Sequence, residues 1–176
     1  MDNFAADKTI HSIRLMVNLN IDIPEGFLEE ETRCGHLVSR QTKELWAIEL
    51  DLLHELRRVC EKHGLKFAAD CGTLLGAIRH KGFIPWDDDV DVCMLRSDYE
   101  RLCEVAPKEL EYPYEWLTHD TDNRFNKGFA KLCNSLTTAI ENPYWKRNQG
   151  VFIDIFPLDN LTQDAEQLEK QKHDVL

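Results

Sequence analysis

The stretch GFIPWDDDVDVCML, residues 82–95, places four carboxylates within five positions and then turns apolar. The carboxylates belong to Asp87, Asp88, Asp89 and Asp91. Like charges this close repel one another, so solvent, a bound cation, or a cation carrying a substrate is needed to offset the repulsion. Side chains two positions apart on a strand share a face, which predicts that Asp89 and Asp91 project together while Val90 and Val92 face the core.

A pair of converging carboxylates suits a hard cation. Magnesium takes few protein oxygens and keeps positions open for waters and phosphates, so Mg²⁺ is the expected ion, with Mn²⁺ as the other candidate. Three other interpretations compete: an EF-hand loop, an acidic strand edge without a ligand, and the D-x-D of nucleotide-sugar glycosyltransferases. The EF-hand is disfavoured because Val92 stands where that loop needs a glycine. The local chemistry does not exclude the acidic strand edge or the D-x-D glycosyltransferase.

The whole chain limits the classes of function. Its 176 residues suit one domain, which we expect over residues 39–176 after an irregular N-terminal arm of residues 1–38. The net charge of −11 argues against nucleic-acid partners and against simple electrostatic docking on anionic lipid. No signal peptide or apolar run of membrane-spanning length is evident, so a cytoplasmic protein is expected, with peripheral membrane association left open. The six cysteines lack C-x-x-C spacing and are expected to be reduced thiols.

A long amphipathic helix is predicted ahead of the acidic stretch. It begins at Ser39 or Thr42 and ends near His63, where Gly64 supplies a stop. Other predicted elements are strands at 65–70, 89–95, 114–119, 129–135, 137–140 and 151–158, and helices at 74–80, at 98–106 with a Ser97–Glu100 capping box, and from Thr162 onward. This order indicates an α+β or mixed α/β domain, and we expect α+β.

Candidate phosphate ligands precede the acids. Gly72 and Thr73 lie at a predicted strand-to-helix turn, where a close backbone approach and free N–H groups favour a phosphate. Arg79 and Lys81 follow in an otherwise acidic chain and could neutralise phosphate oxygens, Arg79 by a bidentate contact. His80, between them, is expected to be structural.

A third carboxylate is predicted from a strand farther along the chain. Asp154 interrupts an apolar run from Val151 to Leu158, which is costly unless the carboxylate is paired or coordinates a metal. Capping a loop or pairing with a core base is the structural alternative. Two-metal sites use such a third acid. Lys131 lies upstream of this strand and is expected to face the site as a substrate ligand.

The motifs together resemble a known family. The stretches CGTLLGAIRHKGFIPWDDDVDVCMLRSDYERL (71–102) and GVFIDIFPLD (150–159) are similar to the LicD family, which includes fukutin-type enzymes, and the resemblance spans about residues 39–160. It implies a polymerase-beta-like nucleotidyltransferase fold, a mixed sheet flanked by helices. Matched residue by residue, it also implies metal binding by Asp89, Asp91 and Asp154, and phosphate contact by the Gly72–Thr73 turn.

The resemblance also implies an activity. It is metal-dependent transfer of a phosphorylated alcohol, such as phosphocholine or ribitol phosphate, from a CDP-linked donor to a hydroxyl, with release of CMP. The implied acceptor is a cell-surface glycan such as teichoic acid or lipopolysaccharide, or its lipid-linked precursor. A D-x-D glycosyltransferase and an inactive metal- and nucleotide-binding module are the alternatives. Family members continue beyond the DIFPLD strand, so the resemblance implies either a fragment or a minimal member.

Overall fold

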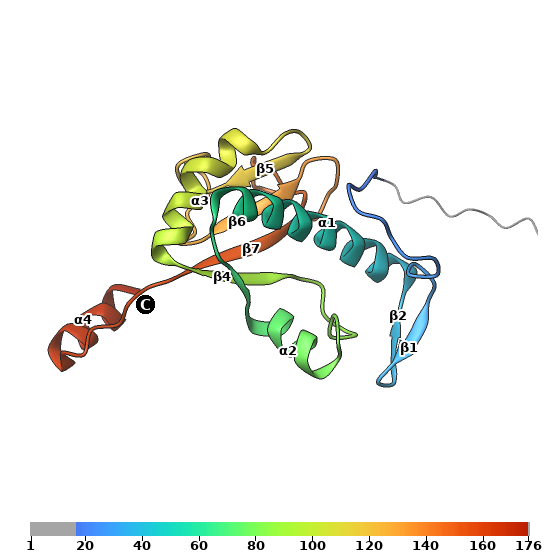
Figure 1. The fold of residues 1–176 in the computed structure, drawn as a ribbon, viewed down its shortest axis with the longest axis horizontal. Helices are drawn as coiled ribbons and strands as arrows, with labels where there is room; N and C mark the ends of the chain where they lie inside the picture. Colours follow the sequence, from blue (N-terminus) through green and yellow to red (C-terminus); the bar gives the residue numbers. More distant parts are fainter. Residues whose placement is uncertain (1–16, 176) are drawn as a thin grey trace, which may run out of the picture.

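The computed structural model describes residues 17–175 and shows one mixed sheet with helices packed on it (Figure 1). The five-stranded sheet has the order β3-β4-β7-β6-β5, in which only β4 and β7 are parallel. A separate two-stranded hairpin precedes it. This arrangement confirms the predicted α+β class. The elements are β1 (Glu31–Arg33), β2 (His36–Val38), α1 (Arg40–His63), β3 (Ala68–Ala69), α2 (Cys71–Arg79), β4 (Asp91–Leu95), α3 (Arg96–Glu109), β5 (Tyr114–Leu117), β6 (Ala130–Asn134), β7 (Val151–Leu158) and α4 (Ala165–Val175).

Helix α1 has the ends that the sequence predicts. The Ser39 side chain accepts a hydrogen bond from the Thr42 N–H at 3.1 Å, which satisfies one of the free donors of the first turn. Gly64 ends the helix in the left-handed region at φ 67°, a conformation that glycine adopts without strain. The long helix therefore begins and ends at residues whose chemistry favours those positions.

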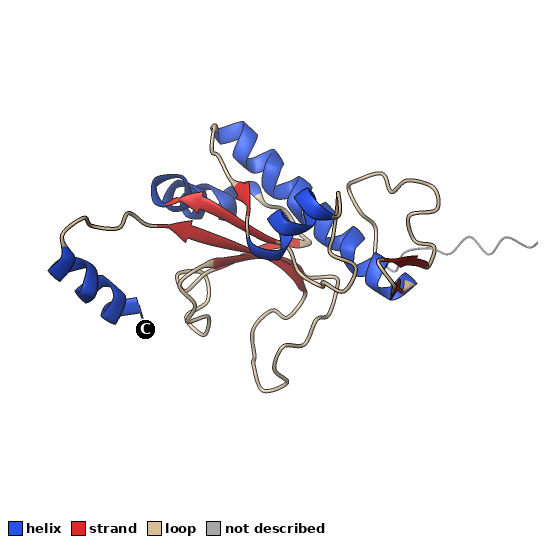
Figure 2. Cartoon of the chain, turned by 90° about the horizontal axis from the view of Figure 1, so that it is seen from below, coloured by secondary structure: helices blue, strands red, loops and turns tan. Residues whose placement is uncertain are grey.

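Helices α1 and α3 cover one face of the sheet, and Figure 2 shows the long helix running across the strands. On β7, the odd-numbered residues Val151, Ile153 and Ile155 are buried in this core, whereas Phe152 and Asp154 lie on the opposite face and are half-buried. The opposite face is partly covered by Phe125 and Phe129, and α2 packs against β4. Helix α4 extends away from the sheet (Figure 1).

Several predicted elements are corrected by the structure. The expected capping box is absent: α3 begins after Leu95 without a side-chain cap. The reason is that the helix already begins at Arg96, which places Ser97 inside the first turn and not at the N-cap position. The predicted strand at 137–140 is a loop, because Thr137 folds back on Asn134 through backbone and side-chain hydrogen bonds. The strand predicted at 65–70 keeps only the two residues of β3.

The N-terminal arm is more ordered than predicted where it is described. Residues 1–16 lie outside the described part, but β1 and β2 form an antiparallel hairpin within the segment predicted to be irregular. Cys34 and Gly35 connect the strands with φ values of 52° and 77°. Two successive positive φ values are typical of the tight turn that matches the twist of a hairpin.

No helix among residues 17–175 is long and apolar enough to cross a membrane. The six cysteines, all within the described residues, are free, as expected.

Candidate active site

Strand register brings two of the predicted acids side by side. Asp91 on β4 is the register partner of Asp154 on β7, and Asp154 is in turn the partner of Lys131 on β6. On the outer side of β4, the Asp70 N–H donates to the Asp91 carbonyl at 3.0 Å. A transverse row of charged residues therefore crosses the face of the sheet that α1 and α3 leave uncovered.

Asp89 reaches this row from a loop, not from a strand. Strand β4 begins at Asp91, so Asp89 precedes the strand predicted to hold both acids. Val90 and Val92 are both buried in the core, as predicted. The preceding backbone is held instead by Trp46 of α1, whose indole N–H donates to the Asp87 carbonyl at 2.9 Å and whose ring stacks on Phe83 at 4.6 Å between centroids. The carboxylates of Asp87, Asp88 and Asp89 each present an oxygen within 4.8 Å of the others.

The first turn of α2 supports the acids directly. The Thr73 hydroxyl oxygen accepts a hydrogen bond from the Asp91 N–H at 2.8 Å and so ties the helix to the start of β4. A Cβ at position 72 would lie 2.6 Å from a carboxylate oxygen of Asp87. Glycine is therefore needed here for the close approach of Asp87, a role that the sequence analysis did not foresee. The predicted phosphate contacts of Gly72 and Thr73 stay predictions.

Gly72→Ala is expected to weaken divalent-cation binding roughly tenfold, because the added methyl group displaces the Asp87 carboxylate from its place beside the proposed ligand Asp89, while helix propensity keeps the fold stable. Calorimetric titration with Mg²⁺ measures the change. Gly128→Ala is the matched control, since nothing lies within 4 Å of a Cβ at position 128. Equal affinities in the two variants would show that the fit of Asp87 against Gly72 has no part in the site.

Crowding shifts the acids toward their neutral forms. Burial and then the charge of Asp91 raise the pKa of Asp89 to about 6. Burial also raises the pKa of Asp154 to about 6, against the lowering effect of Lys131. The pKa of Asp91 is raised as well, by burial and by Asp70. A cation placed among these carboxylates would offset both the burial of their charges and the repulsion between them.

Glu49 of α1 is a further acid that the sequence analysis missed. It is only 1% exposed, and burial, followed by the charges of Asp89, Asp88 and Asp87, raises its pKa from 4.5 to about 9. The available signal was its place on the apolar stripe of α1, between Leu45 and Leu52, where an acid is as unusual as Asp154 is within β7.

The metal-free protein is expected to lose stability as the pH rises. Between pH 4.5 and about 9 the unfolded chain releases the Glu49 proton and the folded chain keeps it, so the folded state binds more protons and its stability falls. Glu49→Gln should flatten this slope and raise the melting temperature most at the alkaline end. Thermal unfolding at several pH values measures it, with Glu61→Gln, an exposed site paired with Arg57 on the same helix, as the control. A slope unchanged by Glu49→Gln would contradict the expectation.

Lys131 is buried beside Asp154. It is 3% exposed, and its Nζ lies 3.7 Å from Asp154 Oδ1, 3.0 Å from Glu141 Oε2 and 3.1 Å from the Phe152 ring centroid. The distance to Asp154 is too long for a hydrogen bond. Asp154 Oδ1 accordingly has no hydrogen-bond partner among the described residues. Lys131 therefore lies beside the buried, unpaired oxygen of Asp154, and its role as a substrate ligand stays a prediction.

The residues present fit a divalent cation. Asp89, Asp91 and Asp154 offer only carboxylate oxygens, the donors that magnesium and manganese prefer. A buried oxygen of Asp154 lacks a partner among the described residues, and the raised pKa values of Asp89 and Asp154 reflect burial and neighbouring carboxylates that a cation would offset. Binding of the ion by Asp89, Asp91 and Asp154 stays a prediction, and the acids whose oxygens lie within 4.8 Å of one another are Asp87, Asp88 and Asp89.

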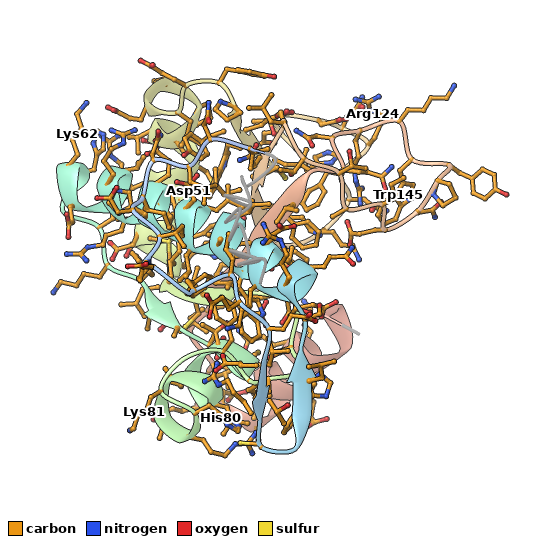
Figure 3. All side chains as sticks on the ribbon, turned by 90° about the vertical axis from the view of Figure 1, so that its right-hand side faces the viewer. Asp51, Lys62, His80, Lys81, Arg124 and Trp145 are labelled. Atoms are coloured by element: carbon orange, nitrogen blue, oxygen red, sulfur yellow. The ribbon has the colours of Figure 1, made fainter. Side chains whose placement is uncertain are left out.

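Two predicted phosphate ligands lie apart from the acids. Arg79 and Lys81 are exposed at the far end of α2 from Thr73, and Figure 3 shows Lys81 and His80 at this end of the helix. The Arg79 Nε donates to His80 at 2.8 Å, and the His80 carbonyl accepts from Arg33 of the hairpin at 3.2 Å. No contact joins either base to the acidic row within residues 17–175. Their roles as phosphate ligands stay predictions.

Comparisons with known proteins identify the family of this chain. Residues 64–175 match the family model described as LicD/FKTN/FKRP, nucleotidyltransferase domain. The chain is 36% identical over 118 residues to the lipopolysaccharide cholinephosphotransferase LicD of Haemophilus influenzae, covering 65% of this chain and 43% of that protein. It is 37% identical over 108 residues to an uncharacterised protein of Rickettsia prowazekii, covering 61% of this chain and 38% of that protein. The chain thus spans less than half the length of these relatives, and it belongs to the LicD family of nucleotidyltransferase domains.

Proposed function

We propose that this protein transfers a phosphorylated alcohol of the phosphocholine type from a CDP-linked donor to a hydroxyl of a cell-surface glycan or its lipid-linked precursor. The observation that carries the proposal is the register of Asp91 with Asp154, and Asp89 lies two residues before Asp91 in the preceding loop, in a cluster with Asp87 and Asp88. The H. influenzae relative named a lipopolysaccharide cholinephosphotransferase supports the choice of group and acceptor. We propose a cytoplasmic location, with peripheral contact to a membrane where the acceptor is lipid-linked.

The reaction is a displacement at the distal phosphorus of the donor. The acceptor oxygen forms a bond to that phosphorus, the bridging phosphorus–oxygen bond breaks, and CMP leaves. Because such transfers depend mainly on positioning and charge stabilisation, no nucleophilic side chain is required. A divalent cation held by Asp89, Asp91 and Asp154 would supply the positive charge that screens the diphosphate.

Asp154 is the residue that we assign to the acceptor proton. Its Oδ1 has no hydrogen-bond partner among the described residues, and burial raises the pKa of this carboxyl, which makes the carboxylate a stronger base. Lys131 Nζ lies 3.7 Å from Asp154 Oδ1 and positions this carboxylate. Thr73 and Gly72 present the first turn of α2 to the phosphates, and Arg79 and Lys81 are the outer basic contacts that we propose.

The test is a calorimetric titration of the protein with CDP-choline, CDP-ribitol and CDP-glycerol, each with and without magnesium. We expect magnesium-dependent binding of at least one of them, lost in Asp89→Asn. The competing D-x-D glycosyltransferase predicts magnesium-dependent binding of a nucleotide-sugar such as UDP-glucose instead. Binding of the sugar nucleotide and of none of the CDP-alcohols would overturn the proposed donor class.

A further inference from the structure

Helix α2 turns its large apolar side chains outward. The buried residue of this helix is Gly76, which packs so closely on the following loop that an added Cβ would lie 2.5 Å from the Gly82 carbonyl oxygen. Leu74, Leu75 and Ile78 are 44%, 46% and 66% exposed. Surface helices normally bury such a stripe against the core, so α2 leaves an apolar face that residues 17–175 do not cover.

The tip of the β1–β2 hairpin and the loop after α2 extend this face. Cys34 Sγ lies 3.7 Å from His80 Nδ1, and Arg33 donates to the His80 carbonyl at 3.2 Å, so the tip contacts the C-terminal end of α2. Trp86 is 56% exposed and meets the His80 ring edge-on at 5.9 Å between centroids. Figure 1 shows α2 and the hairpin along one edge of the molecule. The α2 surface, as we define it, consists of Leu74, Leu75, Ile78, Arg79, Lys81 and Trp86.

The α2 surface is basic within an acidic chain. Residues 71–86 contain no Asp or Glu, although the whole chain has 32 of them. Arg79 and Lys81 are exposed here, and Arg33 adjoins them through its contact with His80. The net charge of −11 repels an anionic membrane at a distance, so any contact has to be made by a local basic patch. Bases beside exposed leucine, isoleucine and tryptophan are typical of helices that lie in a membrane interface.

We propose that the α2 surface docks on an anionic lipid bilayer. Its apolar side chains enter the interfacial layer, and its bases, which have no contact with the acidic row among the described residues, meet lipid phosphates. The inference rests on the peripheral membrane contact in the proposed function and names the surface that makes it.

Docking through α2 brings the acidic row close to the bilayer. The helix has nine residues and is therefore about 13 Å long. Its first turn holds the Thr73 hydroxyl against the Asp91 N–H. The acids thus lie within about one helix length of the lipid headgroups, where a glycan carried on a lipid can reach them.

Co-flotation of the protein with phosphatidylcholine vesicles, with and without phosphatidylglycerol, tests this proposal. The wild-type protein should bind the anionic vesicles at least roughly tenfold more tightly than the neutral ones. Ile78→Glu should weaken binding to the anionic vesicles at least roughly tenfold, because it removes an inserted side chain and adds a negative charge. Leu161→Glu makes the same change of charge at a 75% exposed residue after β7 and should bind as the wild-type protein does.

A second measurement uses the wild-type fold and a mild variant. Brominated phosphatidylcholine in the anionic vesicles should quench tryptophan fluorescence of the wild-type protein. Trp86→Phe should lose most of this quenching, because Trp46 and Trp116 are buried and the α2 surface holds Trp86 at the lipid.

The outcomes separate the docking surface from the proposed function. Vesicle binding that persists in Ile78→Glu, or quenching that is unchanged in Trp86→Phe, overturns the docking surface. A wild-type protein that binds no vesicles overturns it as well, and a dimer that Ile78→Glu dissociates would then identify a second copy as the cover of α2. A protein that binds a CDP-alcohol with magnesium but no vesicles loses the docking surface alone, and one that binds vesicles but no CDP-alcohol loses the proposed donor class alone.

Discussion

Asp91→Asn is expected to lower turnover by at least roughly a thousandfold, because losing one anionic ligand removes several kcal/mol of charge stabilisation in the transition state. The fold should survive. Asn has nearly the same shape, the Asp91 backbone N–H keeps its hydrogen bond to Thr73, and one member of a crowded set of like charges is gone. We therefore expect the melting temperature to stay equal or to rise. CMP release and thermal unfolding, measured on the same preparation, give the two readouts.

Asp159→Asn is the control for this experiment. Asp159 lies directly after the end of β7. Its side chain is exposed and pairs with Arg96. Its replacement should leave the rate of CMP release within about twofold of the wild-type rate, since exposed ion pairs contribute little to stability. The account would be contradicted by near-normal turnover in Asp91→Asn, or by a variant that loses turnover only because it has unfolded.

The largest effect on stability is expected for Trp46→Ala, at about 3–5 kcal/mol in the free energy of unfolding. Trp46 is 2% exposed, stacks on Phe83 at 4.6 Å and donates to the Asp87 carbonyl at 2.9 Å. Truncation leaves a large cavity under α1 and frees the acidic loop from the helix. Denaturant unfolding measures the loss, and magnesium affinity should fall in the same variant because the loop is no longer held.

Trp46→Phe separates the contribution of ring stacking from that of the indole hydrogen bond. It keeps a ring against Phe83 but removes the N–H, so about 1 kcal/mol of stability should be lost. Tyr144→Ala is the surface control, because this side chain is 87% exposed and its loss should change stability by less than about 0.5 kcal/mol. A loss in Trp46→Ala as small as that in Tyr144→Ala would show that Trp46 does not anchor the site.

Local chemistry was enough to predict the main elements. Helix α1 begins after Ser39 and ends before Gly64 because both residues favour those positions in any context. Asp154 could be singled out in the sequence because a carboxylate in an apolar strand needs a partner. In the structure, Asp154 is the register partner of Asp91. The α+β class followed from the order of these elements.

What the sequence could not supply depends on contacts between distant segments. The capping box of Ser97 is absent because α3 follows β4 directly and begins at Arg96, so Ser97 lies within its first turn. Asp89 and Asp91 do not share a strand because Trp46, on a different element, holds the preceding loop. Glu49 joins the acids only through the packing of α1, which no local pattern specifies.

The most direct test of the central claim is to identify the nucleotide that is released. The protein is incubated with magnesium, a glycan acceptor and either CDP-choline or UDP-glucose, and the reaction is followed by ³¹P NMR. The account predicts that CDP-choline gives CMP and a new phosphodiester signal, both absent in Asp91→Asn, and that UDP-glucose is not consumed. Release of UDP from UDP-glucose, with CDP-choline unchanged, would contradict it.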